Sequence, residues 1–414
     1  MIEPLLFKKL YNLEHKIEKT YDFNLESYKE FLKGFNNPQL NIGRIIHVAG
    51  TNGKGSVAEM ISSILLSAGY RVGTYTSPHI KEVNERIKFN GRKISDREFS
   101  LLEKKVYREI SKGEKSYRTY FEGLTTLAFL YFEKKKCDFS VIEVGLGGRL
   151  DSTNVVQSEV QIITKIGLDH TELLGNTLEK IASEKSGIIK ESSVVFTFNQ
   201  NDKVMEELRK KASIMHAEIH AIDCEEVKEK SRRIFEFEKR SYRINQLGKY
   251  QMENAALCIK TAEHLKINRK TIREGVKNFR IEGRMEILSK NPLIIADGSH
   301  NPHAIERTMG EIKMLYPKKR ITSVSIFMAD KDYKKSIEIL KKYADKVILT
   351  EIPFFRCAKK NDYSHLKVDF EENPKKALRA ALGRKNSLII FIGSFYLISE
   401  ARDSVKSVFQ SLHS

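Results

Sequence analysis

Short apolar runs along the chain alternate with longer segments in which apolar residues recur every three or four positions. The runs predict buried β-strands, and the longer spacing predicts amphipathic helices. Their regular alternation is typical of a mostly parallel sheet covered by helices on both faces. In the first two thirds of the chain we expect strands at 45–49, 71–76, 138–143, 160–166, 194–198 and 218–222, and helices at 57–68, 97–112, 118–135, 249–266 and 269–278.

The alternating pattern begins again near residue 284. This restart predicts a smaller, Rossmann-like α/β domain at 282–414, after a larger domain at 1–281. Residues 226–246 are polar and alternating, and no element is assigned to them. In the second domain we expect strands at 292–296, 321–328, 346–350 and 387–392, and helices at 302–315, 333–344, 374–382 and 396–410.

The segment that joins the first strand to the first helix is rich in glycine and reads HVAGTNGKGS. Glycines allow several backbone N–H groups to point toward one anion, and the start of a helix adds its positive dipole. Lys54 would reach the terminal phosphates of a nucleotide, and the Ser56 hydroxyl would bind Mg²⁺. We therefore expect a phosphate-loop-type ATPase domain whose loop consists of Gly50, Thr51, Asn52, Gly53, Lys54, Gly55 and Ser56.

This loop departs from the strict pattern G-x-x-x-x-G-K-[ST] at two places. Val48 stands where the first glycine is usual, and Gly55 separates Lys54 from Ser56. The alternative interpretation is a glycine-rich connection between a strand and a helix. A lysine and a hydroxyl at the start of a helix favour phosphate binding.

Polar residues also follow other predicted strands, at Ser77, at Glu143 and at Asp169-His170. Ligands of open α/β sheets lie beyond the carboxyl ends of the strands, so these groups should converge on one crevice. Together they suggest Mg²⁺ sites, although Mg²⁺ prefers oxygen and a histidine ligand such as His170 is less usual. The alternatives are a hydrogen-bonded structural histidine and, for Glu143, a solvated loop carboxylate.

Two further candidates lie in the second domain. The segment Asp297-Gly298-Ser299-His300 follows an apolar strand, and its alternative interpretation is an Asx turn before a proline that starts a helix. Arg284 lies near the domain boundary, where an arginine could move onto a transferring phosphoryl group. The alternative for Arg284 is a surface salt bridge.

Composition narrows the class of protein. The chain has 414 residues and a net charge of +18, but its lysines are scattered among glutamates, which is typical of solvated helix faces rather than a nucleic-acid surface. No apolar run approaches the roughly 18–20 residues of a membrane helix. The four cysteines are far apart and the N-terminus does not resemble a signal peptide. We expect a cytoplasmic protein with neither nucleic-acid nor membrane partners.

Taken together, these segments resemble the folylpolyglutamate synthase/dihydrofolate synthase family, within the wider Mur ligase superfamily. The resemblance runs from about residue 38 to the C-terminus and is loose over 200–245. The motifs that carry it are IIHVAGTNGKGSVAEM, YTSPHIKEVNERI, VIEVGLGGRLDSTNVV, GLDHTELLGNTLEKIASEKSGIIK, YQMENAAL, GRMEILSKNPLIIADGSHNP, MADKD and IGSFYL.

The resemblance implies ATP and two Mg²⁺ sites as cofactors. Ser56 and Glu143 are similar to ligands of the nucleotide's Mg²⁺, and Ser77, Glu143 and His170 to ligands of a second Mg²⁺. Lys185 matches a lysine that the family carbamylates, and the alternative is an ordinary surface lysine. A carbamate would turn this cation into an anion near the metals.

The resemblance also implies roles toward the substrates. Asn254 matches a nucleotide-contacting asparagine, Arg284 would approach the terminal phosphates, and Asp297 would bind ribose hydroxyls. His300 and Ser394 lie where the family handles the acyl phosphate and the incoming glutamate. Lys54, Lys185, His170, Arg284 and His300 form the expected catalytic set.

The implied reaction is an ATP-dependent amide ligation by a monomer acting on small molecules. ATP phosphorylates a folate or pteroate carboxylate, and the amine of L-glutamate attacks the acyl phosphate. The resemblance covers both the extension of folates and the addition of glutamate to dihydropteroate.

Three other classes of protein share part of this pattern. A Mur-type peptidoglycan ligase carries a further domain before the ATP loop, and the 49 residues before Gly50 are too few for it. An ATPase acting on nucleic acid would need a coherent basic stripe. A noncatalytic nucleotide-binding module is disfavoured because every motif keeps its reactive residue.

Overall fold

The computed structural model describes residues 24–112, 118–329, 331–354, 356–383 and 387–410. Within this part, the chain divides into two compact units, of which the first extends to 228 and includes 235–243 and 252–279. The second comprises 229–234, 244–251 and the chain from 280 onward. The domain boundary at 281/282 stays a prediction.

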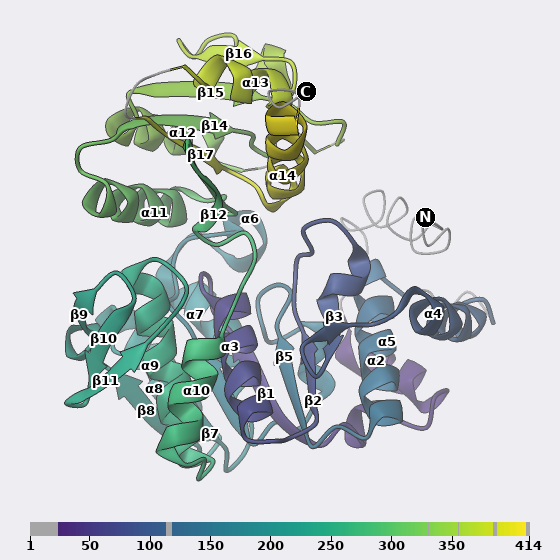
Figure 1. The fold of residues 1–414 in the computed structure, drawn as a ribbon. Coiled ribbons are helices and arrows are strands. Elements are labelled where there is room, and N and C mark those ends of the chain that lie inside the picture. The colour runs from purple at the N-terminus through teal and green to yellow at the C-terminus, as the bar shows by residue number, and fades with distance from the viewer. Residues whose placement is uncertain (1–23, 113–117, 330, 355, 384–386, 411–414) are drawn as a thin grey trace. The chain divides into compact units, whose positions relative to one another are not determined.

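The first unit is built on an eight-stranded sheet of order β4-β3-β2-β5-β1-β6-β7-β8 (Figure 1). The six strands from β2 to β8 in this order are parallel, and β3 and β4 are antiparallel at one edge. All six predicted strands are present, as expected for buried apolar runs. The strands are β1 (Arg44–Ala49), β2 (Val72–Tyr75), β3 (Ile87–Phe89), β4 (Arg92–Lys93), β5 (Phe139–Glu143), β6 (Val160–Ile163), β7 (Val194–Phe198) and β8 (Glu218–Ile222).

Helices cover this sheet, and α3 and α10 lie side by side in Figure 1. The apolar side chains along one face of α3, at Val57, Met60, Ile61, Ile64 and Leu65, are buried, and the hydroxyl of Ser95 accepts the Glu98 N–H at the start of α4. The pattern missed α2, α6, α7 and α8. The helices are α2 (Leu25–Lys33), α3 (Lys54–Ser67), α4 (Asp96–Ile110), α5 (Tyr120–Lys135), α6 (Thr171–Leu174), α7 (Leu178–Ser186), α8 (Asp202–Ile214), α9 (Lys249–His264) and α10 (Arg269–Asn278).

Residues 226–246, to which the sequence assigned no element, contain a three-stranded sheet of order β11-β10-β9. Its strands are β9 (Lys228–Ser231), β10 (Ile234–Phe237) and β11 (Arg240–Arg243). Phe235, Phe237 and Tyr242 are buried among exposed charged residues. β9 has no buried side chain, β10 has two and β11 has one, so the apolar signal is too short to recognise.

The second unit has a six-stranded sheet of order β12-β13-β17-β14-β15-β16, parallel except for β12. The apolar runs predicted its four central strands, whereas β12 is partly exposed and β16 is short. The strands are β12 (Glu286–Lys290), β13 (Leu293–Asp297), β14 (Arg320–Ser325), β15 (Lys346–Thr350), β16 (Asp369–Glu371) and β17 (Ser387–Ile392), and the helices are α11 (Pro302–Leu315), α12 (Tyr333–Tyr343), α13 (Pro374–Ala381) and α14 (Phe395–Gln410).

The α/β fold class is thus confirmed in both units. No helix in the described ranges is long and apolar enough to cross a membrane.

Two helical glycines give opposite predictions for stability. A Cβ on Gly275 of α10 would lie 2.4 Å from the Ile64 Cα of α3, whereas one on Gly310 of α11 would meet only the Tyr343 hydroxyl at 3.9 Å. Gly275→Ala should lower the free energy of unfolding by roughly 1–3 kcal/mol through overpacking. Gly310→Ala should raise it by roughly 0.5–1 kcal/mol, because alanine restricts the unfolded chain. Denaturant and thermal unfolding of the full chain would measure both, and equal stabilities would contradict the close packing of α3 and α10.

Candidate active site

The glycine-rich loop follows β1, and α3 begins at Lys54. Gly50 and Gly53 have backbone φ angles of 140° and 96°, which residues other than glycine rarely adopt. A Cβ on Gly53 would lie 3.0 Å from Oδ1 of Asn254, so this predicted nucleotide-contacting residue of α9 lies against the loop. The structure therefore brings Asn254 and the loop together.

The loop is also bonded to the segment that follows β6. The N–H groups of Thr51 and Asn52 donate to the Lys165 carbonyl at 3.0 and 3.4 Å. The Thr51 hydroxyl donates to the Gly167 carbonyl and accepts from the Gly167 N–H, both at 3.0 Å. These bonds hold the loop beside the segment that carries Asp169 and His170.

Lys54 and Ser56 occupy the first turn of α3. The ammonium of Lys54 donates to the Thr51 carbonyl at 3.3 Å, and Ser56 is buried. Because the first N–H groups of a helix lack partners within the helix, this turn is suited to an anion.

Glu143 ends β5, and its carboxylate lies next to the loop. The pairing of β1 with β5 sets Val48 beside Glu143, and a Cβ on Gly55 would lie 3.4 Å from Oε2 of Glu143. The same oxygen accepts the Ser77 N–H at 2.9 Å, and Glu143 is only 3% exposed. Two of the predicted metal ligands, Glu143 and Ser77, are therefore in direct contact.

His170 precedes α6 with a φ of 50°, and its N–H donates to Oδ1 of Asp169 at 2.9 Å. Its ring Nε2 lies 4.0 Å from the same carboxylate oxygen. The ring is about one third exposed, so it is open to a ligand from solvent. Its position beside a carboxylate favours a polar site over a structural core histidine.

Lys185 of α7 is a buried lysine whose pKa lies far below its ordinary value. It is 5% exposed, and burial, together with the nearby Lys54 cation, lowers the pKa of its ammonium to about 7. Asp169, Asp151 and Glu184 act in the opposite direction but more weakly. Lys185 is therefore not the ordinary surface lysine of the alternative interpretation.

A buried polar chain behind the loop was not predicted. Asp151 accepts the N–H groups of Leu146 and Thr153 and the Thr153 hydroxyl at 2.8, 2.9 and 2.5 Å, and burial raises its pKa. The Thr153 oxygen lies 2.9 Å from Nε2 of His47, whose pKa burial lowers to about 3. A histidine within the apolar run of β1 was the available signal.

In the second unit, Asp297 ends β13 and is completely buried. Both carboxylate oxygens accept hydrogen bonds from this unit, so Asp297 holds the backbone beside Arg284. The donors are Met285 N–H at 2.8 Å, Tyr250 hydroxyl at 3.3 Å, Ser299 N–H at 2.9 Å, Ser299 hydroxyl at 2.5 Å and Thr308 hydroxyl at 3.4 Å. A role in ribose binding stays a prediction.

His300 and Ser394 lie in two neighbouring loops of the second unit. The ring Nδ1 of His300 lies 3.2 Å from the Gly298 carbonyl, and the hydroxyl of buried Ser394 accepts the Tyr396 N–H at 3.3 Å. The Gly393 N–H donates to the Ser299 carbonyl at 2.9 Å, which joins the two loops. The structure thus brings these two predicted residues to the same edge of the sheet.

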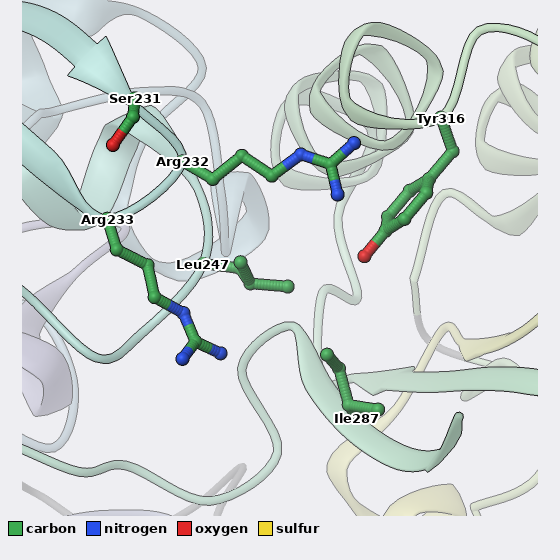
Figure 2. A pocket seen from close by; sticks show the side chains of 6 residues that line it. All are labelled: Ser231, Arg232, Arg233, Leu247, Ile287 and Tyr316. Atoms are coloured by element: carbon green, nitrogen blue, oxygen red, sulfur yellow. The ribbon is translucent and has the colours of Figure 1, made fainter.

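A hollow of about 440 Å³ in the second unit contains none of the predicted residues (Figure 2). Two guanidinium groups and a phenol extend into it from its sides. Its lining consists of Ser231, Arg232, Arg233, Leu247, Ile287 and Tyr316.

The predicted metal ligands have suitable chemistry for Mg²⁺. Glu143 supplies a buried carboxylate, and Ser56 and Ser77 supply hydroxyls, all of them oxygen donors. Across the described ranges, no group of three or more His, Cys, Asp and Glu side chains could hold a metal by itself. Phosphate oxygens and water are the usual remaining ligands of Mg²⁺.

Comparison with known proteins defines the class. The Mur ligase middle domain matches residues 48–262, and the Mur ligase glutamate ligase domain matches residues 283–395. The chain is thus an ATP-dependent ligase of the Mur type.

The match to individual proteins is closer. The chain is 35% identical over 404 residues to the dihydrofolate synthase/folylpolyglutamate synthase of Bacillus subtilis, covering 91% of this chain and 94% of that protein. It belongs to the dihydrofolate synthase/folylpolyglutamate synthase family, which confirms the resemblance.

Solved structures agree with this family. The FolC protein of E. coli in complex with DHPP and ADP has a TM-score of 0.86 and 27% identity over all of both chains. The bifunctional enzyme of Yersinia pestis complexed with AMPPNP and Mn ion has a TM-score of 0.84 and 27% identity, again over all of both chains.

The pKa of Lys185 predicts a pH-dependent stability. The folded pKa of about 7 lies below the ordinary lysine value of about 10.4, so between these values the unfolded chain binds more protons. Stability should therefore rise with pH across this window, by up to about 1.4 kcal/mol per pH unit. Lys185→Met, in CO₂-free buffer, should be more stable than the wild type at pH 7, and the difference should shrink toward pH 10.

Urea unfolding at several pH values would measure this difference. Lys180→Met, at an exposed position of the same helix, is the matched control. A Lys185→Met difference that does not change with pH would show that the Lys185 ammonium is not desolvated.

Proposed function

We propose that this chain joins L-glutamate to folates through an amide bond, and also to dihydropteroate, with ATP hydrolysed to ADP and phosphate. The observation that carries the proposal is that the Glu143 carboxylate accepts the Ser77 N–H and lies next to Gly55 of the glycine-rich loop. Buried Lys185 lies near Lys54 of the same loop. The family supports the proposal, and the E. coli relative binds DHPP and ADP.

A carboxylate is a poor electrophile because its oxygen will not leave at neutral pH. The substrate carboxylate attacks the γ-phosphorus of ATP, ADP leaves, and an acyl phosphate forms. The glutamate amine then attacks the acyl carbon and loses a proton, and phosphate leaves. Lys54 and the N–H groups of its loop stabilise the charge that spreads over the transferred phosphoryl group.

Mg²⁺ would neutralise phosphate charge when bound. Ser56 and Glu143 would hold one ion, and Ser77, Glu143 and His170 would hold a second. Asn254 would contact the nucleotide, as its place beside Gly53 of the loop supports.

Lys185 is suited to become a carbamate. At a pKa of about 7, roughly half of its amines are neutral at pH 7 and able to attack CO₂. The nitrogen bonds to the carbon and releases one proton, which leaves an anion. This anion would relieve the repulsion between Lys185 and Lys54 and would support the metal site.

The residues of the second unit act on the reacting groups. Arg284 would stabilise the phosphates, Asp297 would bind ribose hydroxyls, and His300 and Ser394 would handle the acyl phosphate and glutamate. We further propose a cytoplasmic monomer whose partners are these small molecules and which binds no nucleic acid.

The proposed function predicts which acceptors gain glutamate. The full chain with Mg-ATP and labelled L-glutamate should transfer label to tetrahydrofolate and to dihydropteroate, and Lys54→Met should abolish both. Label on tetrahydrofolate alone would limit the enzyme to folate extension. Label only on a UDP-muramoyl acceptor, supplied in parallel, would replace the proposal with a cell-wall ligase.

The carbamate has its own test. Protein equilibrated with ¹³C-labelled bicarbonate should show one carbamate carbon resonance that Lys185→Ala removes. Lys190→Ala should retain this resonance. Burial also lowers the pKa of Lys190, to about 8, but the Lys190 amine donates to the carbonyl and side-chain oxygens of Asn154. A spectrum without the resonance, in wild-type protein that is active, would contradict the carbamate.

A further inference from the structure

Arg284 projects from an unusual backbone turn in the second unit. Gly283 and Met285 on either side of it have φ angles of 65° and 46°. A positive φ at a residue with a Cβ costs on the order of 1 kcal/mol or more and persists where surrounding bonds enforce it. The turn is therefore held in place by its neighbours.

Hydrogen bonds hold the backbone on both sides of Arg284. The Met285 N–H donates to Asp297 at 2.8 Å, and the Gly298 N–H donates to the Gly283 carbonyl at 2.8 Å. The Gln246 side-chain amide donates to the Arg284 carbonyl. These bonds fix where the side chain of Arg284 starts.

A second set of contacts comes from α14. Glu286 accepts the Gly283 N–H at 2.7 Å and is paired with Arg402 of α14, whose Nη2 lies 2.9 and 2.8 Å from the two carboxylate oxygens. This ion pair holds the turn against the helix that begins at Phe395.

Phe395 determines where the side chain of Arg284 ends. The guanidinium carbon of Arg284 lies 4.3 Å from the centroid of the Phe395 ring, over its face. The ring lies flat against Gly298, where a Cβ would come within 2.8–2.9 Å of three ring atoms. Only glycine at 298 leaves room for the ring in this position.

We propose that Phe395 is a positioning residue for Arg284, an inference that rests on the proposed function. The face of the ring attracts the guanidinium and leaves its N–H edge available to a transferring phosphoryl group. In this role Phe395 acts through Arg284 and not through a contact of its own with substrate or phosphate. It orders the arginine before the substrate arrives and so reduces the entropy lost in the transition state.

The test replaces Phe395 in the full chain by mono-, di- and trifluorophenylalanine, which withdraw charge from the ring face while nearly keeping its shape. A cation–π contribution of about 0.5–2 kcal/mol converts to a total decrease in kcat of roughly 2- to 30-fold. The decrease should follow the number of fluorines, and the KM for ATP should change by less than about twofold. Phe395→Tyr should retain activity, and Phe395→Leu should lose it.

Two controls separate positioning from general packing. Phe370 also has a cation near its ring, with Nζ of Lys360 at 5.8 Å, and its fluorination should leave kcat unchanged. Arg284→Ala should lower kcat strongly and remove the dependence on fluorination at 395. An equal dependence in the Arg284→Ala background would overturn the inference.

Failure of the proposed ligase function can be distinguished from failure of the role proposed for Phe395. A wild type without ligase activity would refute the proposed function, whereas an active wild type with a flat fluorine series would refute only the role of Phe395. The contact itself has a readout independent of activity. Ring-current shifts of the Arg284 side-chain protons should be present in the wild type and absent in Phe395→Leu, and their absence in the wild type would also overturn the inference.

Discussion

The parallel pairing of β1 between β5 and β6 is the constraint on which the rest of the site depends. It sets Val48 beside Glu143 on one side and Ala49 beside Ile163 on the other. Three connections therefore leave the sheet at the same edge, and their polar groups meet without any need for a long flexible loop. The glycine loop can then bond to the segment after β6 while its other side faces the Glu143 carboxylate.

This convergence places like charges close together. Burial of Lys185, together with repulsion from the Lys54 ammonium, lowers the pKa of Lys185 to about 7, so that part of it is neutral at pH 7. The carboxylates of Asp169, Asp151 and Glu184 compensate only in part for this repulsion. The remaining repulsion between the Lys54 and Lys185 ammonium groups would be reduced by an anionic phosphate bound near them.

Much of this could be predicted from the sequence, because the strands are continuous apolar runs and the phosphate loop is contiguous. The contact of Glu143 with Ser77 followed from the rule that strand ends converge. Other features depend on contacts between residues far apart in the chain, as in the bond between His47 and Thr153 or the stacking of Arg284 on Phe395. Neither periodicity nor motif spacing carries such information. The strands β9 to β11 were not predicted for a different reason, since the few buried side chains of this segment are separated by charged ones.

The neutral imidazole of His47 has a consequence for how the site responds to a change in pH. With a pKa of about 3, it stays uncharged well below neutral pH, and its contact with Thr153, whose hydroxyl donates to Asp151, does not depend on a charge on the ring. The contact of His47 with Thr153 is therefore insensitive to pH near neutrality, whereas the amine of Lys185 on α7 titrates near pH 7. A fall in pH below 7 would therefore protonate Lys185 and add a positive charge near Lys54, while the imidazole behind the loop keeps its neutral form.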